Sequence, residues 1–286
     1  MENHESELRR SAVTAFCRLR DRLGRRLPHA VEEIFLQKGL IVHAADMPSW
    51  WHDGGNILVK PPAGGVPPLS YVGTNPPRNA IVVIGSNCNP PSHIFLAGEA
   101  PHLFLGPQCS LPNGTIICGE QSTIVLAGNL FAIHAANLDA RNGGLIYVGD
   151  DNLWSSNVKI ATDDMHAIFD HANVKRLNRF GSNVSIGTHV WLGLDVLINP
   201  GATISDNVVV GSRAVVTKTI PKGCVAVGAP ARVIRRQTTW TREDIRPDVP
   251  TAGTGVMALE REPGGLLRRL SKAVAGPFRR FDASRR

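Results

Sequence analysis

The sequence has few cysteines and no long apolar run. Its five cysteines are irregularly spaced and include no Cys-x-x-Cys pair. This pattern disfavours both a zinc ribbon and a disulfide framework, so we expect reduced thiols. No apolar run approaches the roughly 20 residues that span a bilayer. The first residues, MENHESELRR, are too charged for a signal peptide. We therefore expect a cytoplasmic protein.

Acidic residues are outnumbered by basic ones. The 286 residues include 24 Asp and Glu against 31 Lys and Arg, which gives a formal net charge of +7. An excess of positive charge can favour binding to nucleic acid or to an anionic membrane. Here the arginines are dense near both ends of the chain, while the middle is nearly neutral. That distribution disfavours a nucleic-acid partner and is compatible with peripheral membrane contact through the basic ends, at the inner face of the membrane.

Aliphatic residues recur at every sixth position between residues 184 and 216. They form two registers separated by one outward-facing residue, which is the alternation of short β-strands. A helix of about 3.6 residues per turn would scatter these positions around its surface. The first register is Ile186, Leu192, Ile198, Ile204, Val210 and Val216, and the second is Val184, Val190, Val196, Ala202, Val208 and Ala214. The expected corners, rich in residues that tolerate a left-handed backbone, are Asn183, His189, Asp195, Gly201, Asn207 and Arg213.

A fixed period of this kind predicts a solenoid of stacked short strands, and an ordinary sandwich rarely keeps its turns so evenly spaced. Looser β units, such as IVVIGSN and TIVLAGN, extend the pattern back to Ile81. We expect an N-terminal helix and loop region over 1–80, a β-helix domain over 81–236, and a basic linker and tail over 237–286.

Both ends of the chain have the spacing of basic amphipathic helices. Apolar residues recur at steps of three and four from Leu8 to Leu27, among seven arginines. We expect this helix to cap the solenoid, and the alternative is a surface that rests on anionic lipid. Residues 266–280 have similar spacing. We expect a basic helical tail there, either partly disordered or in contact with a membrane or an acidic partner.

Two adjacent tryptophans, Trp50 and Trp51, precede a Pro/Gly-rich stretch that reads as loops and short extended pieces. Such rings could stack on a sugar. Paired aromatic residues are more often packing residues, so we expect packing first.

One interruption of the repeat carries reactive side chains. The segment TDDMHAIFDHANVKRLNRF, residues 162–180, lies between a loose unit and the strict repeat. An insertion that leaves a solenoid and returns at the next turn projects from its wall, where functional residues tend to gather. His166 can accept and return a proton near neutral pH, and Asp163 and Asp164 are close enough in sequence to orient it. The simpler alternative is a solvated histidine in a polar loop.

The stretch GSNVSIGTHVWLGLDVLINPGATISDNVVVGSRAVVTKTIPKGCVAVGAPARVIRR resembles the C-terminal signature of the left-handed β-helix, hexapeptide-repeat acyltransferases. The landmarks VWLG, INPG, VVTK, GAPA and RVIR keep that signature's spacing. The preceding IYVGDDNLWSSNVKIATDDMHAIFD resembles the acceptor-loop region of the xenobiotic and polysaccharide O-acetyltransferase branch. The resemblance covers about residues 145–236 and does not reach either end.

The resemblance implies an all-β fold of triangular coils wound as a left-handed parallel β-helix, with helical extensions here at both termini. It also implies a homotrimer whose active sites lie between neighbouring subunits. By motif, His166 would be the general base and Asp164 a possible orienting residue. The residues that would line coenzyme A are Ser212, Thr217, Lys218, Arg232 and Arg235.

The sequence therefore predicts an O-acetyltransferase that moves an acetyl group from acetyl-CoA to a hydroxyl of a sugar or polysaccharide precursor, with no metal. Two alternatives remain at this stage. One is a non-catalytic β-helix scaffold in envelope polysaccharide assembly. The other is a metal-dependent, carbonic-anhydrase-like β-helix, which needs three histidines around zinc. Neither the acceptor nor the length of the acyl group follows from the sequence.

Overall fold

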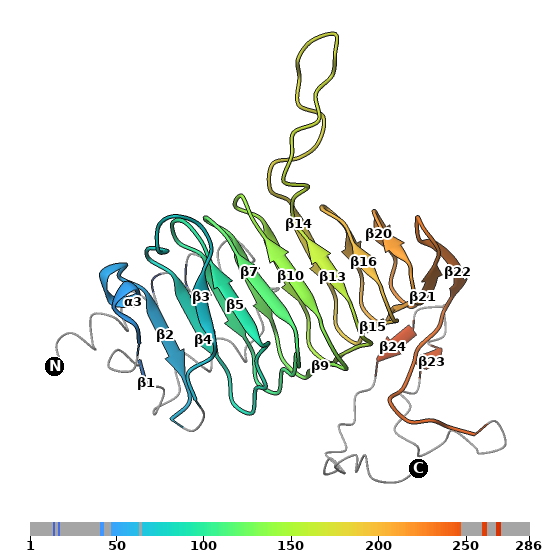
Figure 1. Ribbon diagram of the computed structural model, residues 1–286. Coiled ribbons are helices and arrows are strands. Elements are labelled where there is room, and N and C mark those ends of the chain that lie inside the picture. The colour runs from blue at the N-terminus through green and yellow to red at the C-terminus, as the bar shows by residue number, and fades with distance from the viewer. Residues whose placement is uncertain are drawn as a thin grey trace. The chain divides into compact units, whose positions relative to one another are not determined.

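Three large β-sheets organise the chain in a computed structural model that describes residues 14, 17, 41–42, 47–62, 65–246, 259–261 and 267–269 (Figure 1). The chain divides into two compact units, residues 1–238 and 239–286. In the first unit the strands lie side by side as successive turns of a solenoid (Figure 1). Within the three sheets, neighbouring strands are parallel except where β1 meets β2 and where β21 meets β22.

The sheets contain nine, seven and six strands. The first consists of β1 (Ile41–Val42), β2 (Ile57–Lys60), β4 (Ile81–Ile84), β6 (His102–Leu105), β8 (Thr123–Leu126), β11 (Leu145–Val148), β14 (Asn183–Ile186), β17 (Thr203–Ile204) and β20 (Thr219–Ile220). The second consists of β3 (Leu69–Tyr71), β5 (His93–Leu96), β7 (Thr115–Cys118), β10 (Asn137–Ala140), β13 (Lys159–Ala161), β16 (Leu197–Ile198) and β19 (Val215–Val216). The third consists of β9 (Leu130–Ala132), β12 (Asn152–Trp154), β15 (Trp191–Leu192), β18 (Val209–Val210), β21 (Cys224–Val227) and β22 (Arg232–Arg236).

The aliphatic ladder predicted from the sequence is confirmed. Ile186 pairs in register with Ile204, eighteen residues later, so three six-residue units complete one turn. Both predicted registers point inward and are at most 1% exposed. Earlier turns are longer, since Ile81 pairs with His102, twenty-one residues away. The predicted all-β class, a parallel β-helix of stacked short strands, is confirmed.

The corners also follow the prediction, with one exception. Five of the six expected corner residues have positive φ, which turns the chain from one sheet to the next. Asn183 does not, because it is already the first residue of β14, and the turn falls instead at Gly181, whose φ is 64°. The prediction for Asn183 is wrong, because the inserted segment re-enters the helix two residues earlier. The five confirmed corners are His189, Asp195, Gly201, Asn207 and Arg213.

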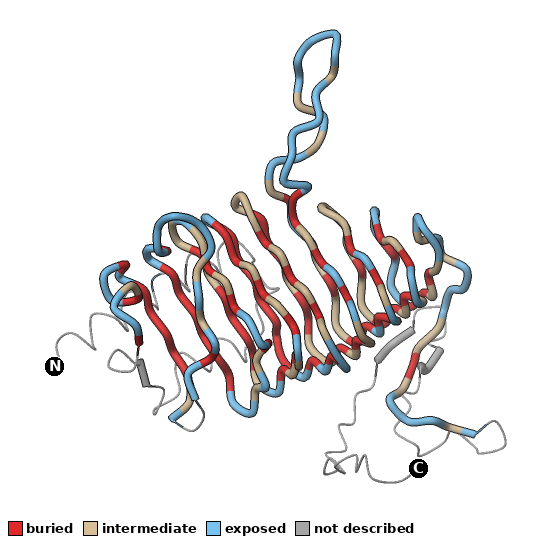
Figure 2. The backbone as a smooth tube through the Cα atoms, in the orientation of Figure 1, coloured by how far each residue is buried: buried red, intermediate tan, exposed pale blue. Residues whose placement is uncertain are grey.

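Parallel pairing extends N-terminally beyond Ile81. Strand β2 is buried along its whole length and pairs in parallel with β4. Before it lies the short helix α3 (Ser49–Asp53), whose Trp51 is 1% exposed and packs into the hydrophobic core. Figure 2 shows the buried residues as segments that recur in every turn of the solenoid. Trp51 is therefore a packing residue.

The expected terminal helices have different outcomes. Residues 8–27, the predicted cap, lie outside the described part of the chain except for Thr14 and Cys17. In the second unit, β23 (Leu259–Arg261) pairs antiparallel with β24 (Leu267–Arg269). The helical prediction for the C-terminal tail is therefore wrong over residues 267–269. The hydrogen-bonded pairing of two strands prevails there over the helical spacing. Among the described residues, no helix is long and apolar enough to cross a membrane.

Candidate active site

The arm, defined here as residues 162–182, leaves the β-helix after β13 and returns at β14 (Figure 1). It projects well beyond the wall formed by the strands, and Figure 2 shows it almost entirely as exposed or intermediate. The sequence predicted an insertion at this place, and the structure confirms that it projects from the solenoid. The arm therefore presents its side chains to whatever approaches this wall.

Asp163 closes the base of the arm. Its Oδ1 accepts the N–H of Met165 at 2.6 Å, and its Oδ2 accepts the N–H of Gly181 at 2.7 Å. Burial raises the pKa of Asp163, but these two main-chain hydrogen bonds outweigh that effect. The Asn142 side chain and the positive charge of Arg176 act in the same direction as the main chain, so the pKa is lowered. A buried carboxylate thus joins the outgoing and returning segments of the arm.

His166 follows closely and is exposed. Asn178, on the returning side of the arm, donates Nδ2 to the main-chain oxygen of His166 at 2.7 Å and to Asp164 Oδ2 at 3.1 Å. The Asn178 Oδ1 accepts the N–H of Ile168 at 2.9 Å. One amide therefore fixes the main chain around His166 and the Asp164 carboxylate. Sequence reasoning missed Asn178, since nothing in the sequence indicates which amide reaches across the arm.

The contacts of Asp164 do not include the imidazole. Among the described residues, the recorded side-chain partner of Asp164 is Asn178. The predicted role of Asp164 as the orienting residue of His166 therefore stays a prediction. What the structure provides is a shared support, because the same amide binds both residues.

The outer part of the arm is a small hairpin with an apolar surface. Phe169 and Arg176 pair as an antiparallel bridge, and Leu177 donates its N–H to the oxygen of Ile168 at 2.7 Å. The guanidinium of Arg176 lies 5.1 Å from the centre of the Phe180 ring. The large apolar side chains that the arm exposes are Met165, Ile168, Phe169, Val174, Leu177 and Phe180. Exposed apolar groups on such a segment indicate a surface that contacts another molecule.

The residues predicted to line coenzyme A are all exposed and lie on the last turns of the helix. A Cβ on Gly193 would lie 2.6 Å from the main-chain nitrogen of Ser212, so glycine is required beside that residue. Thr217 and Lys218 directly follow β19. Arg232 and Arg235 belong to β22.

Direct contacts between this group and His166 are not among those that the structure shows within one chain. No hydrogen bond, ion pair or ring contact recorded for the described residues links His166 to Ser212, Thr217, Lys218, Arg232 or Arg235. Their assignment to one site therefore stays a prediction.

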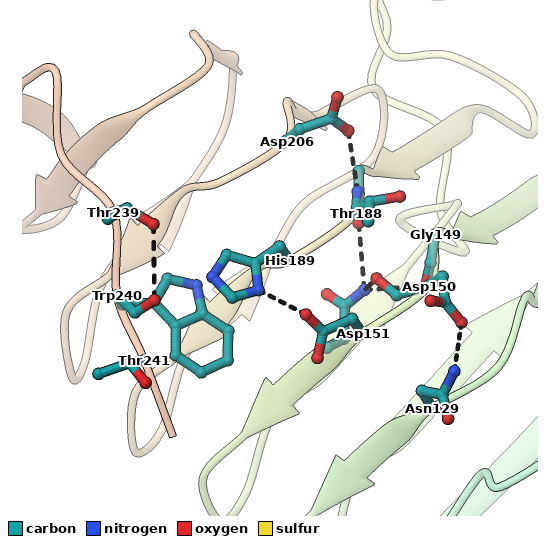
Figure 3. Close-up of polar contacts among 12 residues, drawn as sticks. Asn129, Gly149, Asp150, Asp151, Thr188, His189, Asp206, Thr239, Trp240 and Thr241 are labelled. Carbon is teal, nitrogen blue, oxygen red and sulfur yellow. Dashed lines mark hydrogen bonds and ion pairs between the residues drawn. The ribbon is translucent and has the colours of Figure 1, made fainter. Parts of the chain in front are cut away.

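A second polar cluster joins corners of adjacent turns (Figure 3). His189 is 7% exposed, and its Nδ1 lies 2.5 Å from Asp151 Oδ2. The His189 N–H donates to the oxygen of Asp150 at 3.0 Å. Asp150 Oδ1 in turn accepts Asn129 Nδ2 at 2.9 Å. The sequence identified His189 only as a corner residue, and the structure shows that its ring also ties that corner to the preceding turn.

Trp50 lines an open cavity of about 430 Å³ beside α3, together with Asp53, Asn75 and Arg78. The centre of its ring lies 5.3 Å from that of Tyr71, in an edge-on arrangement. Trp50 is only partly buried, in contrast to Trp51. Contact between Trp50 and a sugar stays a prediction.

Parallel strands at an eighteen-residue register, left-handed corner residues and one projecting arm define a hexapeptide-repeat β-helix. No protein-family model matches the sequence. The chain is 38% identical over 114 residues to the galactoside O-acetyltransferase of Escherichia coli K12. This match covers 40% of this chain and 54% of that protein. It is 34% identical over 99 residues to the polysialic acid O-acetyltransferase of Escherichia coli O1:K1. This match covers 35% of this chain and 32% of that protein.

The solved structures include a similar β-helix. The polysialic acid O-acetyltransferase OatWY is 27% identical, with a TM-score of 0.49, over 63% of this chain and 84% of that chain. The chain spans no more than about half the length of the two curated relatives. Its homologues are O-acetyltransferases of the hexapeptide-repeat family, so the resemblance predicted from the sequence is confirmed.

Proposed function

We propose that this chain is an O-acetyltransferase that transfers an acetyl group from acetyl-CoA to a hydroxyl of a sugar or polysaccharide precursor. The observation that carries the proposal is the placement of His166. Its exposed imidazole stands near the base of an arm on a hexapeptide-repeat β-helix whose homologues are O-acetyltransferases. The galactoside and polysialic acid acceptors in the names of these relatives support a carbohydrate acceptor.

The proposed chemistry needs one general base. The neutral His166 imidazole accepts the proton of the acceptor hydroxyl while the oxygen attacks the thioester carbonyl. A main-chain N–H near the arm stabilises the oxyanion of the tetrahedral intermediate. The C–S bond then breaks, and the departing thiolate takes the proton from the imidazolium. Asn178 supports this role by fixing the main chain at His166.

Coenzyme A would lie along the last turns of the helix. Lys218, Arg232 and Arg235 are exposed cations there, suited to the phosphates of the cosubstrate. The hydroxyls of Ser212 and Thr217 lie on the same turns and can contact the pantetheine arm.

We further propose that the active unit is a homotrimer. Phe131, Leu153 and Trp191 stack in register on the outer face of the third sheet. Phe131 is 42% exposed and Trp191 41% exposed, so the single chain leaves an apolar ladder open to solvent. Association would bury this ladder. It would also allow the arm of one copy to meet the cofactor residues of its neighbour.

A cytoplasmic location is part of the proposal, as is peripheral contact at the inner face of the membrane through the basic ends. Both rest on the sequence, because most of the basic residues in these ends lie outside the described part of the chain. We propose no nucleic-acid partner, on the same distribution of charge.

The proposal is tested by measuring thiol release from acetyl-CoA against galactosides, oligosialic acid, nucleotide sugars and polysaccharide fragments. We expect turnover with at least one of these carbohydrates and a higher melting temperature in the presence of coenzyme A. Absence of both responses would instead favour the scaffold. Among the described residues, no three His, Cys, Asp or Glu side chains gather to hold a metal ion. Metal analysis of the purified protein tests the metal-dependent alternative directly.

A further inference from the structure

Two cysteines lie on neighbouring turns of the β-helix. Asn89 and Ser110 are partners in a parallel bridge, and the N–H of Asn89 donates to the oxygen of Cys109 at 2.8 Å. Cys88 and Cys109 directly precede these two residues, so they occupy matching positions one turn apart. Adjacent strands lie about 5 Å apart, which falls within the Cα separation that a disulfide requires.

Both side chains pack on the interior of the solenoid, where Cys109 belongs to the hydrophobic core and Cys88 is packed against it. The two thiols are close enough to shift each other's pKa in opposite directions. Cys88 Sγ additionally lies 3.0 Å from the main-chain oxygen of Gly106, to which it donates in its thiol form. Cys109 is completely buried, whereas Cys88 is only partly buried. A reagent can therefore reach Cys88 first.

The pKa values of the two thiols also favour Cys88 as the first to react. The hydrogen bond from Cys109 is the main cause that lowers the pKa of Cys88, and it prevails over the opposite effect of burial. The hydrogen bond from Cys88 and complete burial raise the pKa of Cys109 well above its ordinary value. Cys88 is thus both the more accessible thiol and the one whose pKa is lowered.

Two other cysteines provide internal controls. Burial raises the pKa of Cys118 to about 12, and its thiol donates to the main-chain oxygen of His102 at 3.4 Å. Cys224 is buried and donates to the oxygen of Lys222 at 3.5 Å. Both are structural thiols in the core of the same solenoid.

We propose that Cys88 and Cys109 form an oxidation site, in which a peroxide converts the two thiols into a disulfide between neighbouring turns. The Cys88 thiolate attacks hydrogen peroxide, the O–O bond breaks, and the hydroxide that leaves takes up a proton as water. This step leaves a sulfenic acid on Cys88. Cys109 then displaces its hydroxyl, the S–S bond forms, and a second water leaves with the Cys109 proton. The peroxide is reduced by two electrons, and the two thiols are oxidised.

The disulfide would close a loop of about 20 residues, which limits the freedom of the unfolded chain. We therefore expect the oxidised protein to melt on the order of 5–10 °C higher than the reduced protein. A dithiol reductant should reverse the shift. This inference does not depend on acetyl transfer.

The experiment uses the full chain with Cys17→Ser, which leaves four cysteines. After treatment with hydrogen peroxide, the protein is unfolded, alkylated and digested for mass spectrometry. We expect one disulfide-linked pair of peptides, containing Cys88 and Cys109, with Cys118 and Cys224 alkylated. With Cys109→Ser added, Cys88 should instead be trapped as a sulfenic acid by dimedone, while Cys118→Ser should leave the linked pair unchanged.

The Cys17→Ser protein keeps both Cys88 and Cys109, and its result alone can overturn the proposal. The test therefore does not depend on the Cys109→Ser or Cys118→Ser variants folding. If both cysteines remain alkylatable after peroxide treatment, the site does not exist. If Cys88 forms its disulfide with a second molecule, or proceeds to sulfinic acid while Cys109 stays free, the buried thiol does not resolve it and the proposal is wrong.

Discussion

The N–H of Gly181 donates to Asp163 Oδ2 at 2.7 Å, and this hydrogen bond ties the end of the arm to its beginning. Gly181 has a φ of 64°, and a Cβ there would collide with the main-chain oxygen of Asn142. Only glycine can therefore bring its N–H to the carboxylate. The position of His166 relative to the solenoid depends on this closure.

Asp163→Asn should destabilise the protein by about 1–2 kcal/mol at neutral pH, because a buried carboxylate that accepts two N–H groups is replaced by an amide. The pKa of Asp163 is lowered in the folded state, so its contribution is complete above the ordinary carboxyl pKa, near 4. The contribution is lost as the pH falls through the folded-state value. Urea unfolding should therefore show a difference between the two proteins at pH 7 that shrinks near pH 3. A difference that stays constant with pH would contradict this account.

His166→Ala should lower kcat by about 10²–10⁴-fold, as expected for loss of a general base. The matched control is His171→Ala, since His171 is an exposed histidine of the same arm. Rates of thiol release with saturating acetyl-CoA and acceptor provide the measurement. Equal activity of both variants would remove His166 from the mechanism.

Lys218→Ala and Arg232→Ala should each raise the KM for acetyl-CoA by roughly tenfold, corresponding to about 1.4 kcal/mol of lost phosphate interaction. Binding should also become less sensitive to salt, since a screened charge is removed. Lys222→Ala is the control, because Lys222 is another exposed lysine of these last turns. An unchanged KM in both variants would place coenzyme A elsewhere.

Trp191→Asp should convert the proposed trimer into monomers, because it places a charge in the apolar ladder of the third sheet. Sedimentation velocity checks the outcome. Val72→Asp is the matched control, since Val72 is 42% exposed and Trp191 is 41% exposed. Dissociation in both variants would indicate general destabilisation. A Trp191 variant that remains associated would show that another surface joins the subunits.

The strict repeat could be predicted because the aliphatic character of each ladder residue indicates that its side chain is buried. Ile186 and Ile204 are aliphatic at a fixed period, and only stacked short strands bury all such positions. The corner at Asn183 was predicted wrongly, because the arm returns to the solenoid two residues earlier, at Gly181. The period of six does not show where an inserted segment rejoins the repeat. The spacing of residues 266–280 was equally ambiguous, since strand pairing depends on a second segment.

The candidate site was predictable only in part. The break in the repeat located the arm and His166, but the closure at Asp163 and the bridge through Asn178 depend on which groups meet across the folded arm. Cys88 and Cys109 show the same limit. Their separation looks irregular in the sequence and becomes meaningful only once a turn at this end of the helix is known to take twenty-one residues, as between Ile81 and His102.

Strand β22 gives the solenoid a defined stopping point. It forms the edge of the third sheet and runs antiparallel to β21, whereas another turn of the helix would require a parallel strand. Its exposed arginines, Arg232, Arg235 and Arg236, place positive charge along that edge. Unpaired strand edges are templates for aggregation, and charge discourages pairing there. The hairpin thus acts against end-to-end polymerisation of the protein into fibres through this sheet, independently of any part that its arginines have in binding phosphate.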